Sequence, residues 1–170
     1  MLNRLIDFKK MRVFLVYAVY LLIAMLLQGL LFSRLSILGV KGFVLPAAAV
    51  AAGMFLGGVR GAVFGICLGL ITDMSYTEST FMYTIVFALI GFGAGFASEF
   101  YINRSFMVFM VLGTIAVALT GIVQLLSAII FGGAELMQGL LTVLLQTALS
   151  IPPIALLYLP FRNYKEIRQR

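Results

Sequence analysis

Acidic side chains are scarce in this chain, and Asp73 is the one whose position suggests a specific chemical role. The 170 residues include six Asp and Glu and no histidine. Asp73 closes the apolar run GAVFGICLGLITD, which begins at Gly61. A carboxylate at the C-terminal end of a helix meets the unfavourable end of the helix dipole, so helix stability alone does not explain it. Two interpretations stay open: Asp73 caps the following turn, or it is an anchor that orders the loop or contacts a partner or ligand.

The other side chains offer little for catalysis or metal binding. With no histidine and one cysteine, Cys67, the chain lacks the usual metal ligands and cannot form an internal disulfide. It contains no phosphate-binding glycine loop and no serine with a nearby base. Its acids are too scattered to form a pair for acid–base chemistry. The sequence therefore predicts a protein that is not an enzyme and needs no metal or cofactor.

An aromatic and acidic patch follows Asp73. It consists of Tyr76, Glu78, Phe81 and Tyr83. Aromatic residues in such positions are more typical of the belt at a membrane interface than of a ligand pocket. We therefore expect this patch at the outer surface of a membrane, where Tyr76 and Glu78 are candidate partner contacts.

Other polar side chains stand inside or beside apolar runs. Arg60 follows the Gly57–Gly58 pair, and we expect it at an interface because a charge at the bilayer centre is costly. Gln124 and Gln146 are expected to join helices by hydrogen bonds. Glu99 is expected to be an ordinary surface charge beside a loop.

The composition predicts an integral membrane protein. Apolar residues make up 63% of the chain, charged residues only 11%, and the mean hydropathy is +1.14. A soluble domain of this length needs more polar surface. The formal net charge is +6, but the basic residues gather at the two ends of the chain. This arrangement is typical of flanks held against an anionic membrane surface and argues against nucleic-acid binding.

The apolar runs predict an all-α fold with six transmembrane helices. We expect a basic N-terminal segment at 1–12, a membrane domain at 13–160 and a basic tail at 161–170. The second and third segments are short, and a helix of about 15 residues reaches roughly 22 Å, less than the hydrocarbon core. A re-entrant hairpin is therefore an alternative to two crossings. The expected spans begin at Val13 and Pro46 and then cover 59–72, 81–98, 105–131 and 136–159.

The distribution of basic residues predicts that both termini are cytoplasmic. With six spans, 10 of the 12 Lys and Arg residues lie on the inner side, and only Arg34 and Lys41 lie outside. Asp73, Glu78 and Glu135 all fall on the outer side. Basic residues are enriched in the cytoplasmic loops of membrane proteins, which supports this orientation.

Glycines at helical spacing predict close packing between helices. Residues four apart on a helix are separated by about 400° of rotation, so they form a narrow groove that a neighbouring helix can approach closely. The Gly57–Gly58 pair is expected to break the helix. Packing within one bundle is favoured over the alternative uses of the groove, a homodimer contact or a substrate groove. The glycines in question are Gly53, Gly57, Gly61, Gly65 and Gly69, with Gly91 and Gly95 repeating the spacing in the fourth segment.

The run GAVFGICLGLITDMSYT resembles the G-x-x-x-G-x-x-x-D segment and polar loop of the MreD family of rod shape-determining proteins. The likeness extends to the proline at the start of the second segment, the long fifth span and the closing LPFR before a basic tail. It implies a six-helix fold similar to the substrate-binding component of energy-coupling-factor transporters. It also implies Asp73 as a structural or partner-contact residue, with Gly61, Gly65 and Gly69 as packing residues.

The resemblance implies a non-catalytic scaffold of the bacterial cytoplasmic (inner) membrane. Its partners would be MreC directly, and MreB and wall-synthesis enzymes of the elongation complex. The alternative is a substrate-binding component for vitamin uptake, with the patch from Asp73 to Tyr83 as its pocket. Against this, Ala18 and Ala24 are six residues apart, so the A-x-x-x-A docking element of those components is missing, and the chain has no tryptophan. A channel would need charged groups deep in the membrane, and the sequence suggests none.

Overall fold

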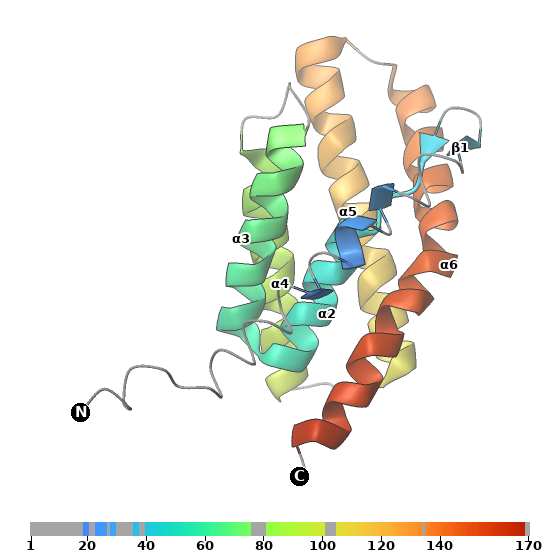
Figure 1. Ribbon diagram of the computed structural model, residues 1–170. Coiled ribbons are helices and arrows are strands. Elements are labelled where there is room, and N and C mark those ends of the chain that lie inside the picture. The colour runs from blue at the N-terminus through green and yellow to red at the C-terminus, as the bar shows by residue number, and fades with distance from the viewer. Residues whose placement is uncertain are drawn as a thin grey trace.

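Helices form nearly all of the chain that the structure describes (Figure 1). This computed structural model describes residues 19–20, 23–26, 28–29, 36–37, 40–75, 81–100, 105–133 and 135–168. The expected N-terminal segment, 1–12, lies outside these ranges, and the described residues from 19 to 29 are helical. The named helices are α2 (Leu45–Leu56), α3 (Gly58–Ser75), α4 (Met82–Phe100), α5 (Phe106–Gly132) and α6 (Leu136–Arg168).

A short strand pair precedes helix α2. Strand β1 (Ser36–Ile37) runs antiparallel to β2 (Val40–Lys41), with Ser36 opposite Lys41. Residues 42–44 then lead into α2 without regular structure. We call residues 42–44 the lead-in peptide.

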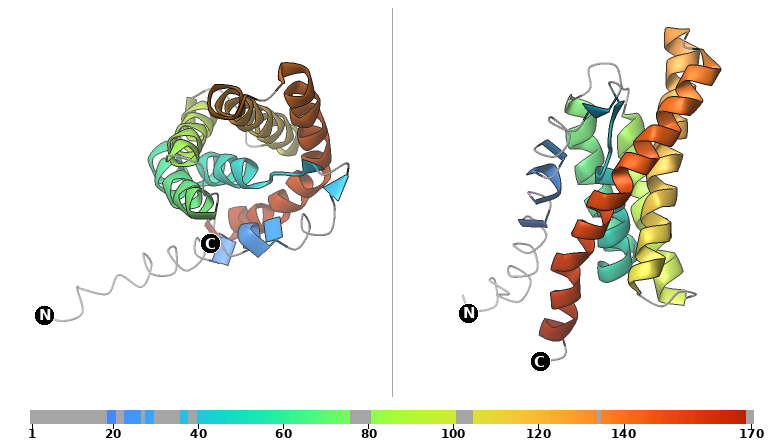
Figure 2. Two further views of the ribbon diagram at one scale, coloured as in Figure 1. Left: turned by 90° about the horizontal axis from the view of Figure 1, so that it is seen from above. Right: turned by 90° about the vertical axis from the view of Figure 1, so that its right-hand side faces the viewer.

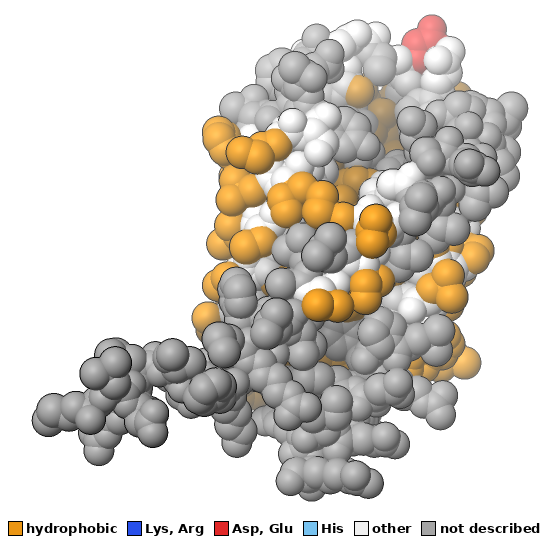
Figure 3. All heavy atoms as spheres, in the orientation of Figure 1, with side chains coloured by type: hydrophobic (Ala, Val, Ile, Leu, Met, Phe, Trp, Pro, Cys, Tyr) orange, Lys and Arg blue, Asp and Glu red, His pale blue; other side chains and the backbone are white. Residues whose placement is uncertain are grey.

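Helices α3, α4, α5 and α6 are each long and apolar enough to cross a membrane. In the space-filling view, hydrophobic side chains lie at mid-height on the visible face, and the acidic atoms in view lie at one end (Figure 3). The described part therefore has the fold of a helical membrane protein. The expected bounds of the fourth and fifth spans agree with α4 and α5 to within two residues.

The expectation of a short third segment is wrong. Helix α3 has 18 residues and continues past Asp73 to Ser75. The apolar run ends at Asp73, but the helical backbone continues for two more residues. Helix α6 also runs further than the expected span, reaching Arg168 within the predicted tail.

Helix α2 is short and lies at the centre of the bundle (Figure 2). Its 12 residues span about 18 Å, and 11 of them are buried. It contacts α3, α4, α5 and α6, whereas α4 and α5 contact each other much less. Alanines at five of its positions let the surrounding helices approach closely. Helix α2 is therefore the core element that joins the α3–α4 hairpin to the α5–α6 hairpin.

Helix α6 bends along its length (Figure 1). It contains Pro152 and Pro153, and it remains helical through both. A proline ring displaces the carbonyl four residues earlier and removes one donor, which is the usual cause of such a bend.

Candidate functional site

The backbones of α2, α3 and α4 come together at glycines. A Cβ atom added at Gly61 would meet the backbone of Gly53 in α2 and would lie 2.6 Å from the Gly91 carbonyl oxygen in α4. A Cβ added at Gly91 would lie 2.7 Å from the Gly61 carbonyl carbon. Real side chains do not tolerate such distances, so any residue other than glycine would force the three helices apart. Gly53, Gly61 and Gly91 thus form one three-helix contact.

The same close approach continues along the α3–α4 pair. A Cβ at Gly65 would lie 2.6 Å from the Phe87 carbonyl carbon, and one at Gly69 would lie 2.6 Å from the Thr84 nitrogen. At the other end of the pair, a Cβ at Gly95 would lie 2.7 Å from the Gly57 carbonyl carbon. The glycine groove is therefore filled by helices of this chain, and a second copy could not enter it. A homodimer would have to use another surface.

The turn between α2 and α3 is made at Gly57. Its φ of 95° is a conformation that other residues rarely adopt. Its N–H donates to the Gly53 carbonyl oxygen at 3.0 Å, which closes α2. The side chain of Glu99 in α4 accepts a hydrogen bond from the Gly58 N–H at 3.3 Å. Glu99 was expected to be an ordinary surface charge, but it ties the end of α4 to the start of α3. We call the end of the bundle that contains this turn the Arg60 end, because Arg60 lies in the first turn of α3.

Asp73 connects the end of α3 to the start of α4. One carboxylate oxygen accepts from the Tyr83 N–H at 3.2 Å, and the other accepts from the Thr84 N–H at 2.9 Å and from the Thr84 hydroxyl. These backbone donors belong to the first turn of α4, which lacks intrahelical acceptors. The positive end of the α4 dipole also favours a negative charge here. Asp73 therefore caps the N-terminus of α4, the helix that follows its own.

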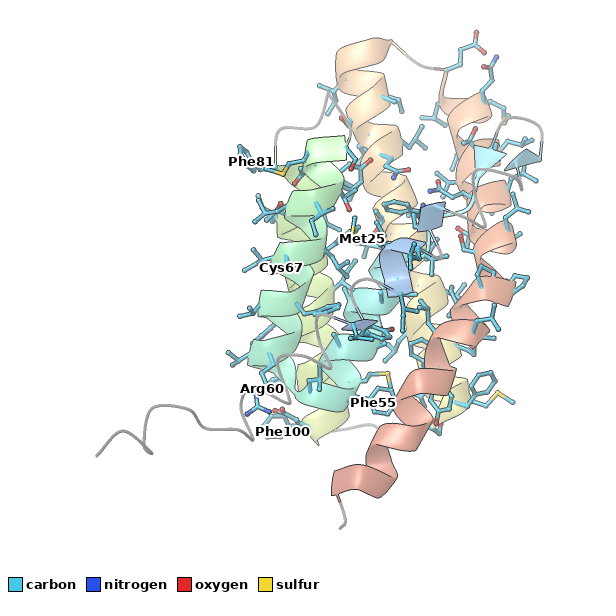
Figure 4. All side chains as sticks on the ribbon, in the orientation of Figure 1. Met25, Phe55, Arg60, Cys67, Phe81 and Phe100 are labelled. Atoms are coloured by element: carbon cyan, nitrogen blue, oxygen red, sulfur yellow. The ribbon has the colours of Figure 1, made fainter. Side chains whose placement is uncertain are left out.

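Two aromatic residues near the start of α4, at the end of the bundle where Asp73 lies, have different surroundings. The Tyr83 ring is half-buried and packs against Phe43 and Phe87, with centroid distances of 5.9 and 6.0 Å. Phe81 is 64% exposed and extends away from the bundle (Figure 4). Its φ of 52° is unusual for a residue with a side chain. Tyr76 and Glu78 lie outside the described residues.

The lead-in peptide is held by side chains from distant parts of the chain. The Ser150 hydroxyl in α6 accepts from the Phe43 N–H at 2.9 Å. The Gln28 amide accepts from the Val44 N–H at 2.9 Å and donates to the Gly42 carbonyl at 3.3 Å. Gly42, Phe43 and Val44 are all buried, so these bonds replace the water that their backbone groups lose. Sequence reasoning missed both Gln28 and Ser150, because polar residues in apolar helices give no sign of which backbone they serve.

The two predicted glutamines have a different environment. Gln146 is buried one turn before Ser150, and Gln124 in α5 is half-buried. Among the described residues, neither side-chain amide has a hydrogen-bond partner, although the Gln146 carbonyl accepts from the Ser150 hydroxyl at 2.7 Å. Their expected role in joining helices stays a prediction.

Replacing Ser150 with alanine should lower the free energy of unfolding by about 1–3 kcal/mol, because it leaves the buried Phe43 N–H without an acceptor. Thr142→Val is the matched control, since the Thr142 hydroxyl is exposed and donates only to the Gln138 carbonyl in its own helix. Thermal unfolding in detergent measures both variants. Equal midpoints for Ser150→Ala and Thr142→Val would show that the lead-in peptide does not depend on this bond.

Comparisons of the chain with protein families, curated proteins and solved structures found no match. The structure by itself defines the class, a helical membrane protein with four described helices long enough to cross a bilayer. Within the described ranges, no group of three or more His, Cys, Asp or Glu residues could hold a metal ion. The likeness to the MreD family lies in the sequence, chiefly in the segment from Gly61 to Thr77.

Proposed function

We propose that this chain is a non-catalytic membrane scaffold of the bacterial elongation complex, which binds MreC and supports lateral wall synthesis directed by MreB. It would lie in the cytoplasmic membrane with six spans and both termini in the cytoplasm. The observation that carries the proposal is the bonding of Asp73 to the first turn of α4. Asp73 is the residue on which the resemblance to the MreD family centres.

Asp73 makes the α3–α4 hairpin a fixed platform. The glycine contacts hold the two helices together along their length, and the carboxylate fixes the start of α4. Phe81, one residue before α4, is thereby presented to the surroundings with most of its ring uncovered. An aromatic side chain has few rotatable bonds and loses little conformational entropy on binding, so it is suited to contact a partner protein.

The second candidate is the substrate-binding component of a vitamin transporter. The observation that favours it is the polar residue Gln146, which is 7% exposed and lies on α6 one turn from the bond between Ser150 and the lead-in peptide. Ligand sites are mostly apolar and contain a small number of polar groups that orient the ligand. This candidate predicts a small-molecule ligand inside the bundle and a coupling subunit as partner.

Affinity purification from native membranes in mild detergent, followed by mass spectrometry, separates the two candidates. The scaffold proposal expects a single-pass partner with a large extracytoplasmic region, together with wall-synthesis proteins. Recovery of a membrane coupling subunit with a pair of ATPases would reject the scaffold and support vitamin uptake.

Phe81→Gly tests the partner contact without weakening the fold. Glycine accepts the φ of 52° at this position, a conformation that costs other residues about 1–2 kcal/mol, so stability should hold or rise. We expect less MreC to co-purify because the exposed ring is lost. Phe100→Ala is the control, since Phe100 is 66% exposed at the opposite end of α4 (Figure 4). Unchanged recovery of MreC with Phe81→Gly would remove Phe81 from the interface.

A further inference from the structure

A shallow hollow opens at the Arg60 end, between the start of α3 and the end of α4. Its volume is about 260 Å³, and Gly58, Arg60, Phe92, Phe96 and Glu99 contribute to its walls. Gly57 and Gly58 leave the space on one side, because neither has a side chain to fill it. The hollow lies at the start of α3 and the end of α4, and both helices are long and apolar enough to cross a membrane. In a bilayer it would therefore lie near the boundary between hydrocarbon and water.

The walls of the hollow carry one positive and one negative group. Arg60 and Glu99 are both exposed, and within the described part of the chain no ion pair joins them. One oxygen of Glu99 accepts from the Gly58 N–H at 3.3 Å, which fixes the carboxylate on this side of the hollow. Among the residues that the structure describes, no group donates to the other oxygen, which is the acceptor that the proposal uses. The hollow thus offers a hydrogen-bond donor with positive charge and a hydrogen-bond acceptor with negative charge.

An apolar strip leads from the hollow toward the middle of α4. Phe96, Phe92, Leu89 and Ile85 follow one another at helical spacing and are 48, 47, 66 and 61% exposed. The Phe92 and Phe96 rings stack, with their centroids 6.3 Å apart. Figure 4 shows Arg60 and Phe100 at the same end of the α3–α4 hairpin, so this strip begins beside charged groups and continues into the apolar part of the bundle.

We propose that this hollow and strip bind one phospholipid whose headgroup carries both a phosphate and a primary ammonium, the phosphatidylethanolamine class. The guanidinium of Arg60 donates hydrogen bonds to the phosphate. The ammonium donates to the free oxygen of Glu99, and an acyl chain lies along the apolar strip. A phospholipid with an anionic headgroup and no ammonium would place Glu99 against negative charge. A choline headgroup has no N–H to donate. The inference is independent of the proposed partner, MreC.

Native mass spectrometry of the delipidated full chain tests this site. The protein is mixed with equal amounts of phosphatidylethanolamine, phosphatidylglycerol and phosphatidylcholine, and bound lipid is counted. We expect phosphatidylethanolamine to form the dominant adduct. Equal binding of the three lipids, or a preference for phosphatidylglycerol, would overturn the proposal.

Two variants locate the binding. Arg60→Gln should lower the affinity for phosphatidylethanolamine about tenfold, the usual worth of a charged hydrogen bond. Glu99→Gln keeps an oxygen to accept from Gly58, so the fold should persist while the preference over phosphatidylglycerol disappears. Glu135→Gln is the control, because Glu135 is exposed and precedes α6 at the opposite end of the bundle (Figure 1). If both test variants keep the preference of the unmodified chain, the lipid does not bind in this hollow.

Discussion

Replacing Gly91 with alanine should lower the free energy of unfolding by about 3 kcal/mol, the upper range for forcing extra volume into a packed core. The new methyl group would meet the backbone of Gly61, with the Gly61 carbonyl carbon 2.7 Å away. A side chain can rotate away from a clash, but the backbone of α3 cannot. Relief therefore requires α3 and α4 to separate, which also opens the contact with Gly53 in α2.

Gly93→Ala is the matched control for this prediction. Gly93 lies two residues further along α4 and is exposed. Apart from the backbone of its own helix, no atom of the described residues lies within 4 Å of the position a Cβ would take. Alanine there should leave stability unchanged or raise it by up to about 1 kcal/mol, because alanine favours a helix over glycine. The measurement is the fraction of monodisperse protein left after heating in detergent. If Gly91→Ala and Gly93→Ala lose monodisperse protein at the same temperature, the close backbone contact at Gly91 does not contribute to stability.

Replacing Asp73 with alanine should cost about 2 kcal/mol of stability. The substitution leaves the Tyr83 and Thr84 N–H groups without their acceptor and removes a negative charge from the positive end of α4. Thr84→Val should cost less, since it removes only the hydroxyl bond to Asp73 and leaves both backbone bonds in place. Thermal unfolding of the two single variants and the double variant measures how much of the two losses in stability comes from the interaction between Asp73 and Thr84.

Glu135→Gln controls for the loss of a carboxylate at this end of the bundle. Glu135 is exposed, and within the described part of the chain its side chain accepts from the Gln138 amide alone, at 3.0 Å. We expect no change in its melting temperature. An Asp73→Ala variant as stable as Glu135→Gln would mean that the cap contributes nothing measurable. If Asp73→Ala folds normally but loses its partner in co-purification, then Asp73 itself contacts the partner.

The sequence alone was enough to predict the class of protein and most helix boundaries. Long apolar runs can only be helical in a bilayer, because the backbone must satisfy its own hydrogen bonds there. The end of α2 at Gly57 was also predictable, since a glycine pair in an apolar run is a local signal for a turn. Helix α3 was predicted too short because the pattern of apolar residues ends at Asp73, whereas the backbone hydrogen bonds continue to Ser75.

Only the tertiary structure decided what the polar residues contact. Asp73 caps α4 from ten residues away, and Ser150 holds the Phe43 N–H across 107 residues of sequence. The position of α2 inside a ring of longer helices was equally hidden, because an apolar helix of 12 residues looks the same whether it faces lipid or protein. Spacing along one helix specifies which residues share a face. Which segment packs against that face depends on how distant parts of the chain fold together, and the local sequence does not show this.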